Sequence, residues 1–409
     1  MEAVLANLKE WYQDRKQHLD LFDETKTERQ DNPFYILGDL VWLSWMAVIA
    51  SGIILMLWYV PTTTGAYRSI QHITLDIPFG WLVRGVHKYG GDMLITCITL
   101  RIYRMYFAGE YKKPGELSWM ILFASLVLAM ISGVTGYTLE WNQRAFWAAK
   151  VILTVPTYYD DIPLIGNLGL GHATAYIFLG GPALGQGTLT RFYSIHFGIS
   201  IVAVILIEVF VYRTRRRRLN LSAFTIVLVL AFLAFLSFMN LADVGDWANN
   251  NRTPLPVLSD WYFLALYQVV KYMPPLWAGI APALLIGYGM VVPFLDRTKE
   301  TKATERPFFF TIGVLALTYW IGFSAYPTID STPTGSIQRL AGANGVPCTP
   351  YTEFYNPNLN LGGVSGIVID NDSAAAQASS IYFSTQGKVT VGTCNNQNCA
   401  VKLTQSSLQ

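Results

Sequence analysis

Seven long apolar stretches constrain this chain more than any other feature of its sequence. They lie near 35–60, 81–107, 117–139, 191–212, 222–241, 277–295 and 308–326. About 20 helical residues cross the roughly 30 Å hydrocarbon core of a bilayer, and each stretch comes close to that length. Only 14% of the residues are charged, whereas soluble domains average about 25%. The sequence therefore predicts an all-α membrane protein with seven transmembrane helices.

Lysine and arginine are distributed unevenly between the two sides of these predicted helices. The N-terminal arm, the 101–116 loop, the run 213–218 and the 297–306 loop together carry eighteen, and the opposite loops and tail carry eight. Because positive charge concentrates on the cytoplasmic side, we expect a multi-pass protein of the cell membrane with a cytoplasmic N-terminus and an extracytoplasmic C-terminus. The net charge of +2 gives no reason to expect nucleic acid as a partner.

The tail, residues 327–409, differs from the rest of the chain. It is rich in Ser, Thr, Asn and Gly and has short alternating runs such as 381–383 and 388–391. This pattern predicts a small β-rich domain on the outer face. Asn371 and Asn251 begin N-glycosylation sequons, which are weak motifs in a single sequence.

One disulfide is expected in the tail, because disulfides persist outside the cytoplasm. Cys394 and Cys399 are five residues apart in a polar segment, and their pairing leaves Cys348 as an odd thiol. Mass spectrometry of unreduced peptides should find Cys394 and Cys399 joined. Finding both as free thiols contradicts this prediction.

Two of the five histidines, His87 and His196, fall inside predicted spans. Each lies five to six residues from the outer end of its helix, so the two stand at similar depth on antiparallel helices. That placement suits two axial ligands of one haem iron. The alternative is a pair of histidines that are hydrogen-bonded within the bundle, although ionisable groups in a membrane usually mark a functional cavity.

Other residues near these histidines suit a haem. Arg84 and Arg191 precede them and could pair with haem propionates, or could simply extend to the membrane interface. Gly38 and Gly52 are fourteen residues apart, about 3.9 helical turns, and therefore share one helix face. Such glycines let a flat ring approach the backbone, or serve close helix–helix packing.

Several motifs resemble cytochrome b of the quinol-oxidising bc complexes. The second span carries Gly80-Trp-Leu-Val-Arg-Gly-Val-His87, and the third ends in Gly136-Tyr-Thr-Leu-Glu-Trp141 followed by Phe146-Trp-Ala-Ala149. Thr188–His196 resembles the start of the family's fourth helix, and Asp260-Trp-Tyr-Phe-Leu264 stands where the family has Pro-Glu-Trp-Tyr. The similarity runs from about residue 34 to about 296.

The chain departs from this family at its second haem site. The resemblance implies a further histidine fourteen residues after each of His87 and His196, but Arg101 and Phe210 stand there. Leu122 occupies the place of a glycine fourteen residues before Gly136. We therefore expect one haem b, near the outer face, with His87 and His196 as iron ligands and with Gly52 and Gly136 beside it. Arg101 could pair with Glu208 inside the bundle.

The resemblance also implies quinol oxidation at the outer face. Asp260 is then the candidate proton acceptor, although it is one methylene shorter than the family's glutamate and could instead cap a helix. Tyr262 and Tyr137 are candidates for the same pocket, and Ala148 replaces a bordering glycine. The implied partners are a Rieske iron–sulfur protein, other respiratory subunits, membrane lipids and a second copy of the chain.

Four regions follow from these expectations. They are a cytoplasmic arm (1–33), a haem-binding four-helix bundle (34–215), a three-helix domain with the quinol-site motif (216–326) and the β-rich tail (327–409). A structural paralogue that serves as a scaffold without quinol turnover is the alternative. A transporter has little support, because paired Gly/Pro breaks do not recur in corresponding spans.

Overall fold

The computed structural model describes residues 2–17, 36–162, 166–181, 183–204, 221–249, 259–272 and 275–329, and the strand segments 364–371, 379–385, 389–391, 394–397 and 400–404. The chain is mostly helical and divides into two compact units. The first comprises Met1–Trp247 and Pro274–Gly322, and the second comprises Ala248–Met273 and Phe323–Gln409. Several predicted features lie outside the described residues, namely Glu208, Phe210, Asn251, Cys348 and Cys399.

A helix occupies each of the seven predicted spans. These helices are α2 (Leu37–Leu55), α4 (Gly80–Ala108), α5 (Glu116–Leu139), α8 (Gln186–Val204), α10 (Ala223–Met239), α12 (Pro275–Leu295) and α13 (Pro307–Ile329). Within the described residues, three segments are long and apolar enough to cross a membrane, namely Leu37–Leu55, Glu116–Leu139 and Pro307–Ala325. The count of seven spans stays a prediction.

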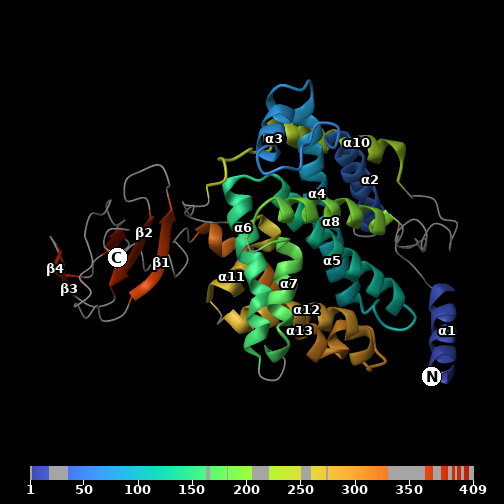
Figure 1. Cartoon of the computed structure of the whole chain (residues 1–409). Helices are drawn as coiled ribbons and strands as arrows, with labels where there is room; N and C mark the ends of the chain where they lie inside the picture. The colour runs from blue at the N-terminus through green and yellow to red at the C-terminus, as the bar shows by residue number, and fades with distance from the viewer. Residues whose placement is uncertain are drawn as a thin grey trace. The chain divides into compact units, whose positions relative to one another are not determined.

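Four of these helices form the bundle that carries the histidines. Helix α2 packs against α4, α4 against α5, and α5 against α8, while α10 covers another side of α4 (Figure 1). Large apolar side chains fill the interior, and Trp45, Ile98 and Trp119 are almost fully buried. Gly109 follows the last residue of α4, and its φ of 70° places it in the left-handed region that suits glycine at a helix C-terminus.

Shorter helices connect these long ones. Those in the first unit are α1 (Glu2–Gln17), α3 (Ala66–Leu75), α6 (Gln143–Thr154), η3 (Val155–Asp161), η4 (Gly166–Leu168), α7 (Leu170–Leu179) and η7 (Ala303–Glu305). The 140–190 connection therefore has helical structure of its own. Helix α6 begins after Asn142, whose side chain accepts a hydrogen bond from the Ala145 amide at 2.8 Å and so caps the helix.

A buried charge cluster joins the α4–α5 connection to the α12–α13 connection. The side chain of Asp296 is fully buried, and its carboxylate accepts hydrogen bonds from the Tyr111 hydroxyl at 2.5 Å and from the Thr298 hydroxyl at 2.5 Å. Lys112 Nζ lies 3.1 Å from this carboxylate, and Arg306 lies 3.6 Å from it. The cluster ties together segments that are almost 200 residues apart.

Helix α1 is attached to the same end of the bundle. Arg15 Nε donates to the Glu116 carboxylate at 2.8 Å, and both side chains are buried. The Trp11 ring lies 6.2 Å from the Phe294 ring. The N-terminal arm thus includes a helix that contacts the first turn of α5.

The second unit contains η6 (Trp261–Phe263), α11 (Leu264–Tyr272) and five strands. Strands β1 (Val364–Asn371), β2 (Ser379–Thr385) and β5 (Ala400–Thr404) form an antiparallel sheet in the order β1-β2-β5. Strands β3 (Val389–Val391) and β4 (Cys394–Gln397) form an antiparallel pair. The strands thus fall within the region that the sequence predicts to be β-rich.

Candidate haem-binding site

His87 and His196 face each other across the four-helix bundle. His87 lies on α4 and His196 on α8, and their ring centres are 6.1 Å apart, with the ring planes at 65°. With metal–nitrogen bonds of about 2.0–2.1 Å, two imidazoles on opposite sides of one metal ion have ring centres about 6 Å apart. The spacing of the two rings therefore fits two axial ligands of one haem iron.

Backbone carbonyls orient both rings. The Nδ1 of His87 lies 2.9 Å from the Val48 carbonyl of α2, and that of His196 lies 2.9 Å from the Ser132 carbonyl of α5. A carbonyl only accepts hydrogen bonds, so each Nδ1 carries the proton and donates it, and each Nε2 keeps its lone pair. Metal-ligating histidines are usually held in this way.

Two glycines provide space next to these rings. A Cβ atom on Gly52 would lie 3.0 Å from His87 Cε1, and one on Gly136 would lie 2.5 Å from His196 Cε1. Any other residue at Gly136 would therefore displace the ring of His196. Both glycines predicted to border the haem stand directly at the histidines.

The two candidate arginines have different surroundings. Arg84 is 5% exposed, and its guanidinium is hydrogen-bonded to Glu140 and to backbone carbonyls of residues 242 and 243. Arg191 is exposed at the start of α8, with its guanidinium against Gly180 and Gly187. Arg84 is thus hydrogen-bonded to protein groups, and Arg191 is the more accessible of the two cations.

Two described positions beyond the histidines carry buried side chains. Leu122 of α5, fourteen residues before Gly136, is 3% exposed. Arg101 of α4, fourteen residues after His87, is 2% exposed. Side chains therefore occupy both positions where a second haem would need a glycine and a histidine.

The candidate quinol-site residues lie in both units. In the second unit, the Tyr262 hydroxyl donates to Asp260 Oδ2 at 3.4 Å, and the Asp260 side chain does not cap the following turn. In the first unit, the Arg144 guanidinium lies 5.1 Å from the centre of the Tyr137 ring, and Ala148 is buried in α6.

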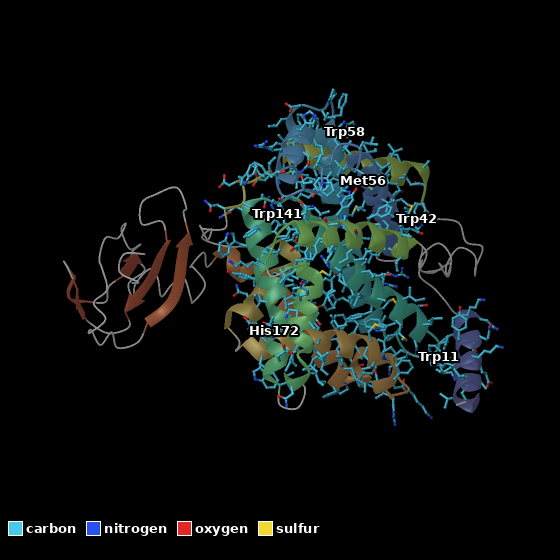
Figure 2. All side chains as sticks on the ribbon, in the orientation of Figure 1. Trp11, Trp42, Met56, Trp58, Trp141 and His172 are labelled. Atoms are coloured by element: carbon cyan, nitrogen blue, oxygen red, sulfur yellow. The ribbon has the colours of Figure 1, made fainter. Side chains whose placement is uncertain are left out.

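Two further histidines pair with aspartates outside the bundle. His72 lies 2.8 Å from Asp76, and His172 on α7 lies 2.5 Å from Asp160 (Figure 2). Hydrogen bonds from the side chain and backbone of His172 and from the Gly171 amide hold the pKa of Asp160 below its ordinary value. Both imidazoles are largely exposed, so they differ from the pair that the bundle holds.

Two facing imidazoles inside a helical bundle, each oriented through Nδ1, are typical of a cofactor site built between the helices of a membrane protein. Comparison with known proteins specifies the family. Residues 24–216 match the family described as cytochrome b/b6/petB, and residues 247–337 match cytochrome b(C-terminal)/b6/petD. The chain belongs to the cytochrome b/b6 family, and this membership implies haem binding and electron transport in a membrane.

Individual relatives agree with this assignment. Cytochrome b6 of Porphyra purpurea is 34% identical over 195 residues, which is 47% of this chain and 87% of the relative. Cytochrome b6 of Prochlorococcus marinus strain MIT 9215 is 34% identical over 197 residues, again 47% and 87%. A solved structure named hyperthermophilic respiratory Complex III shares the fold with a TM-score of 0.65 at 23% identity, covering 80% of this chain and 90% of that one.

Sequence reasoning missed several contacts at the site. The carbonyls of Val48 and Ser132 belong to the backbone, so no residue type signals their role. Glu140 is part of a motif that resembles the family, but its pairing with Arg84 depends on a contact between residues 56 positions apart. The charge of Glu140, beside apolar Leu139 and Trp141, is the one signal that could have indicated a buried ion pair.

Proposed function

We propose that this chain is the cytochrome b-like subunit of a respiratory bc-type complex, which oxidises quinol at the outer face and carries a single haem b between His87 and His196. The observation that carries the proposal is the facing imidazole pair, with ring centres 6.1 Å apart and both Nδ1 atoms at backbone carbonyls. When bound, haem b supplies one-electron transfer.

Several groups of the chain would hold this cofactor. His87 and His196 offer the Nε2 lone pairs, and Gly52 and Gly136 leave space beside the rings. Arg191 is the accessible cation for a haem carboxylate. The burial of Leu122 and Arg101 supports a single haem, because neither residue offers a ligand and both side chains occupy the interior of the bundle.

At the quinol site, Asp260 is the proposed proton acceptor. Its carboxylate is within hydrogen-bonding distance of the Tyr262 hydroxyl, which would orient it. The absence of a capping hydrogen bond from its side chain speaks against the capping alternative.

Replacing Asp260 with asparagine should slow quinol oxidation by on the order of 10²-fold, because a positioned general base contributes about that much. Asparagine has nearly the same shape and still accepts a hydrogen bond, so the haem spectrum and assembly should stay unchanged. Stopped-flow reduction of haem b by a quinol would measure the rate. Normal turnover in this variant would remove Asp260 from the mechanism.

The proposed partners and orientation rest on separate observations. The shared fold with a chain of a respiratory Complex III supports association with other respiratory subunits, a Rieske protein among them, and with a second copy of the chain. The uneven distribution of lysine and arginine supports a cytoplasmic N-terminus and an extracytoplasmic C-terminal domain in the cell membrane.

The scaffold alternative makes a different prediction for one experiment. If the chain is an electron-transfer subunit, quinol added to membranes should reduce its haem b within the turnover time of the complex. If it is a scaffold, the haem should stay oxidised while other cytochromes become reduced. The observations that favour the scaffold are Arg101 and Leu122 at the positions of the second haem site, and the aspartate at position 260.

A further inference from the structure

Residues 240–247, here called the strap, follow α10 and lie against the histidine-bearing bundle. Six of its backbone carbonyls accept hydrogen bonds from donors of α3, α4, the α5–α6 connection and the first residue of α6. The Tyr89 hydroxyl donates to the carbonyl of Asn240 at 2.5 Å, and the Arg84 guanidinium donates to those of Ala242 at 2.7 Å and Asp243 at 2.5 Å. The Asn142 side chain donates to Val244 at 3.1 Å, the Tyr67 hydroxyl to Gly245 at 2.7 Å, and the Gln143 backbone amide to Asp246 at 2.8 Å. The strap is therefore held through its backbone, largely independently of its own side chains.

Arg84 is the charged donor among these residues. It stands three residues before His87, about 4.5 Å along the helix axis. Besides the two strap carbonyls, its guanidinium donates to Glu140 Oε1 at 3.0 Å and to the Thr74 hydroxyl at 3.2 Å. A guanidinium keeps its charge at any ordinary pH, so this site holds one permanent positive charge near the histidine pair.

Glu140 supplies the matching negative charge. Its second oxygen accepts a hydrogen bond from Asn142 Nδ2 at 2.9 Å, so both carboxylate oxygens are engaged. Between them stands Trp141, which is 6% exposed and has a φ of 49°, a backbone conformation that L side chains rarely adopt. Figure 2 marks this tryptophan near the start of α6. Across this turn Asn142 contacts both Glu140 and the strap carbonyl of Val244.

The ion pair affects the electrostatics of the histidine site. Arg84 is 5% exposed, so water screens its charge poorly. An uncompensated cation would stabilise the reduced form of a nearby redox centre, because reduction adds a negative charge. With Glu140 ionised, the positive charge is largely cancelled.

We propose that Glu140 is a positioning residue of the haem site, which fixes Arg84 on the strap and cancels its charge, and thereby keeps the reduction potential of the haem low. The proposal rests on the proposed function, since it requires a haem between His87 and His196.

Redox titration of haem b in the purified complex tests this inference with the variant Glu140→Gln. Glutamine keeps one acceptor for the guanidinium but loses the negative charge. The midpoint potential should rise by about 59 mV, which corresponds to roughly a tenfold change in the equilibrium constant for one electron. An unchanged midpoint potential in a variant that retains its haem overturns the proposal.

Two controls separate this role from a purely structural one. Glu140→Asp keeps the charge and should keep a potential close to that of the wild type. Glu110→Gln removes a similar charge from the Arg104–Glu110 pair, joined at 3.1 Å at the other end of α4, and should leave the potential unchanged. A shift of equal size in Glu110→Gln would contradict the specific role of Glu140.

If the Glu140→Gln complex does not assemble, the midpoint potentials of Arg84→Gln and of the double variant test the same inference. Arg84→Gln leaves Glu140 uncompensated and should lower the potential, and the double variant Arg84→Gln/Glu140→Gln should restore it. No restoration overturns the inference. A wild-type complex without haem b would instead overturn the proposed function, so the two failures can be distinguished.

Discussion

Replacing His87 or His196 with alanine is expected to abolish the haem b absorbance of this chain rather than to halve it. Each substitution removes one of the two imidazoles whose ring centres are 6.1 Å apart, and alanine offers no donor for the iron. Among the described residues, no other facing histidine pair could retain a haem. Reduced-minus-oxidised spectra and pyridine haemochrome assays of the purified variants would measure the loss.

The matched control is His172→Ala. His172 also pairs through Nδ1, but with Asp160, and its side chain is 76% exposed. This variant should keep the full haem signal. A residual b-type spectrum in His87→Ala or His196→Ala would show that the chain ligates haem elsewhere.

The second large effect is expected at Asp296, far in sequence from the histidines. Asp296→Asn keeps the shape of the side chain but leaves Lys112 and Arg306 as buried cations without their counter-charge. Removing one partner of a buried ion pair costs about 3–5 kcal/mol, so the free energy of unfolding should fall by that amount. Denaturant titration in detergent would measure it.

Glu305→Gln, in the same connection, is the control. Glu305 lies 4.0 Å from Lys302, and both side chains are exposed. Its loss should change the free energy of unfolding by less than about 0.5 kcal/mol. Equal effects of the two substitutions would contradict a special role for the buried cluster.

The pH dependence of stability gives Asp296 a second signature. Burial alone would raise its pKa, but hydrogen bonds from Thr298, Tyr111 and Lys112 outweigh burial and hold the pKa below the ordinary value. The carboxylate therefore stabilises the fold above about pH 4, the pKa of an unfolded aspartate, and this contribution is lost as the pH falls through the lower folded-state pKa. The acid-side loss of stability should be smaller in Asp296→Asn.

Much of the helical framework was predictable because apolar length determines where a chain can cross a bilayer. A helix occupies each predicted span, but the boundaries differ where local chemistry intervenes. The first span was expected to reach residue 60, yet α2 ends at Leu55. Pro61 disfavours helical backbone at the residue before it, and this restriction is one reason why the helix stops short.

The histidine pair was predictable for a similar reason, because equal depth on antiparallel helices follows from counting residues. Contacts that depend on distant segments were not predictable. The carbonyl partners of the histidines come from α2 and α5, and the strap that engages Arg84 lies 158 residues further along the chain. The sequence predicts that Arg84 pairs with a haem carboxylate, but its contacts with Glu140 and with the strap carbonyls could not be foreseen from it.

The number of haems per chain tests the central claim most directly. Quantitative pyridine haemochrome analysis, combined with amino-acid analysis of the purified complex, gives this ratio. We predict one haem b per copy of this chain, because Leu122 and Arg101 stand, buried, at positions where a second haem would need a glycine and a histidine. A ratio of two would contradict the account.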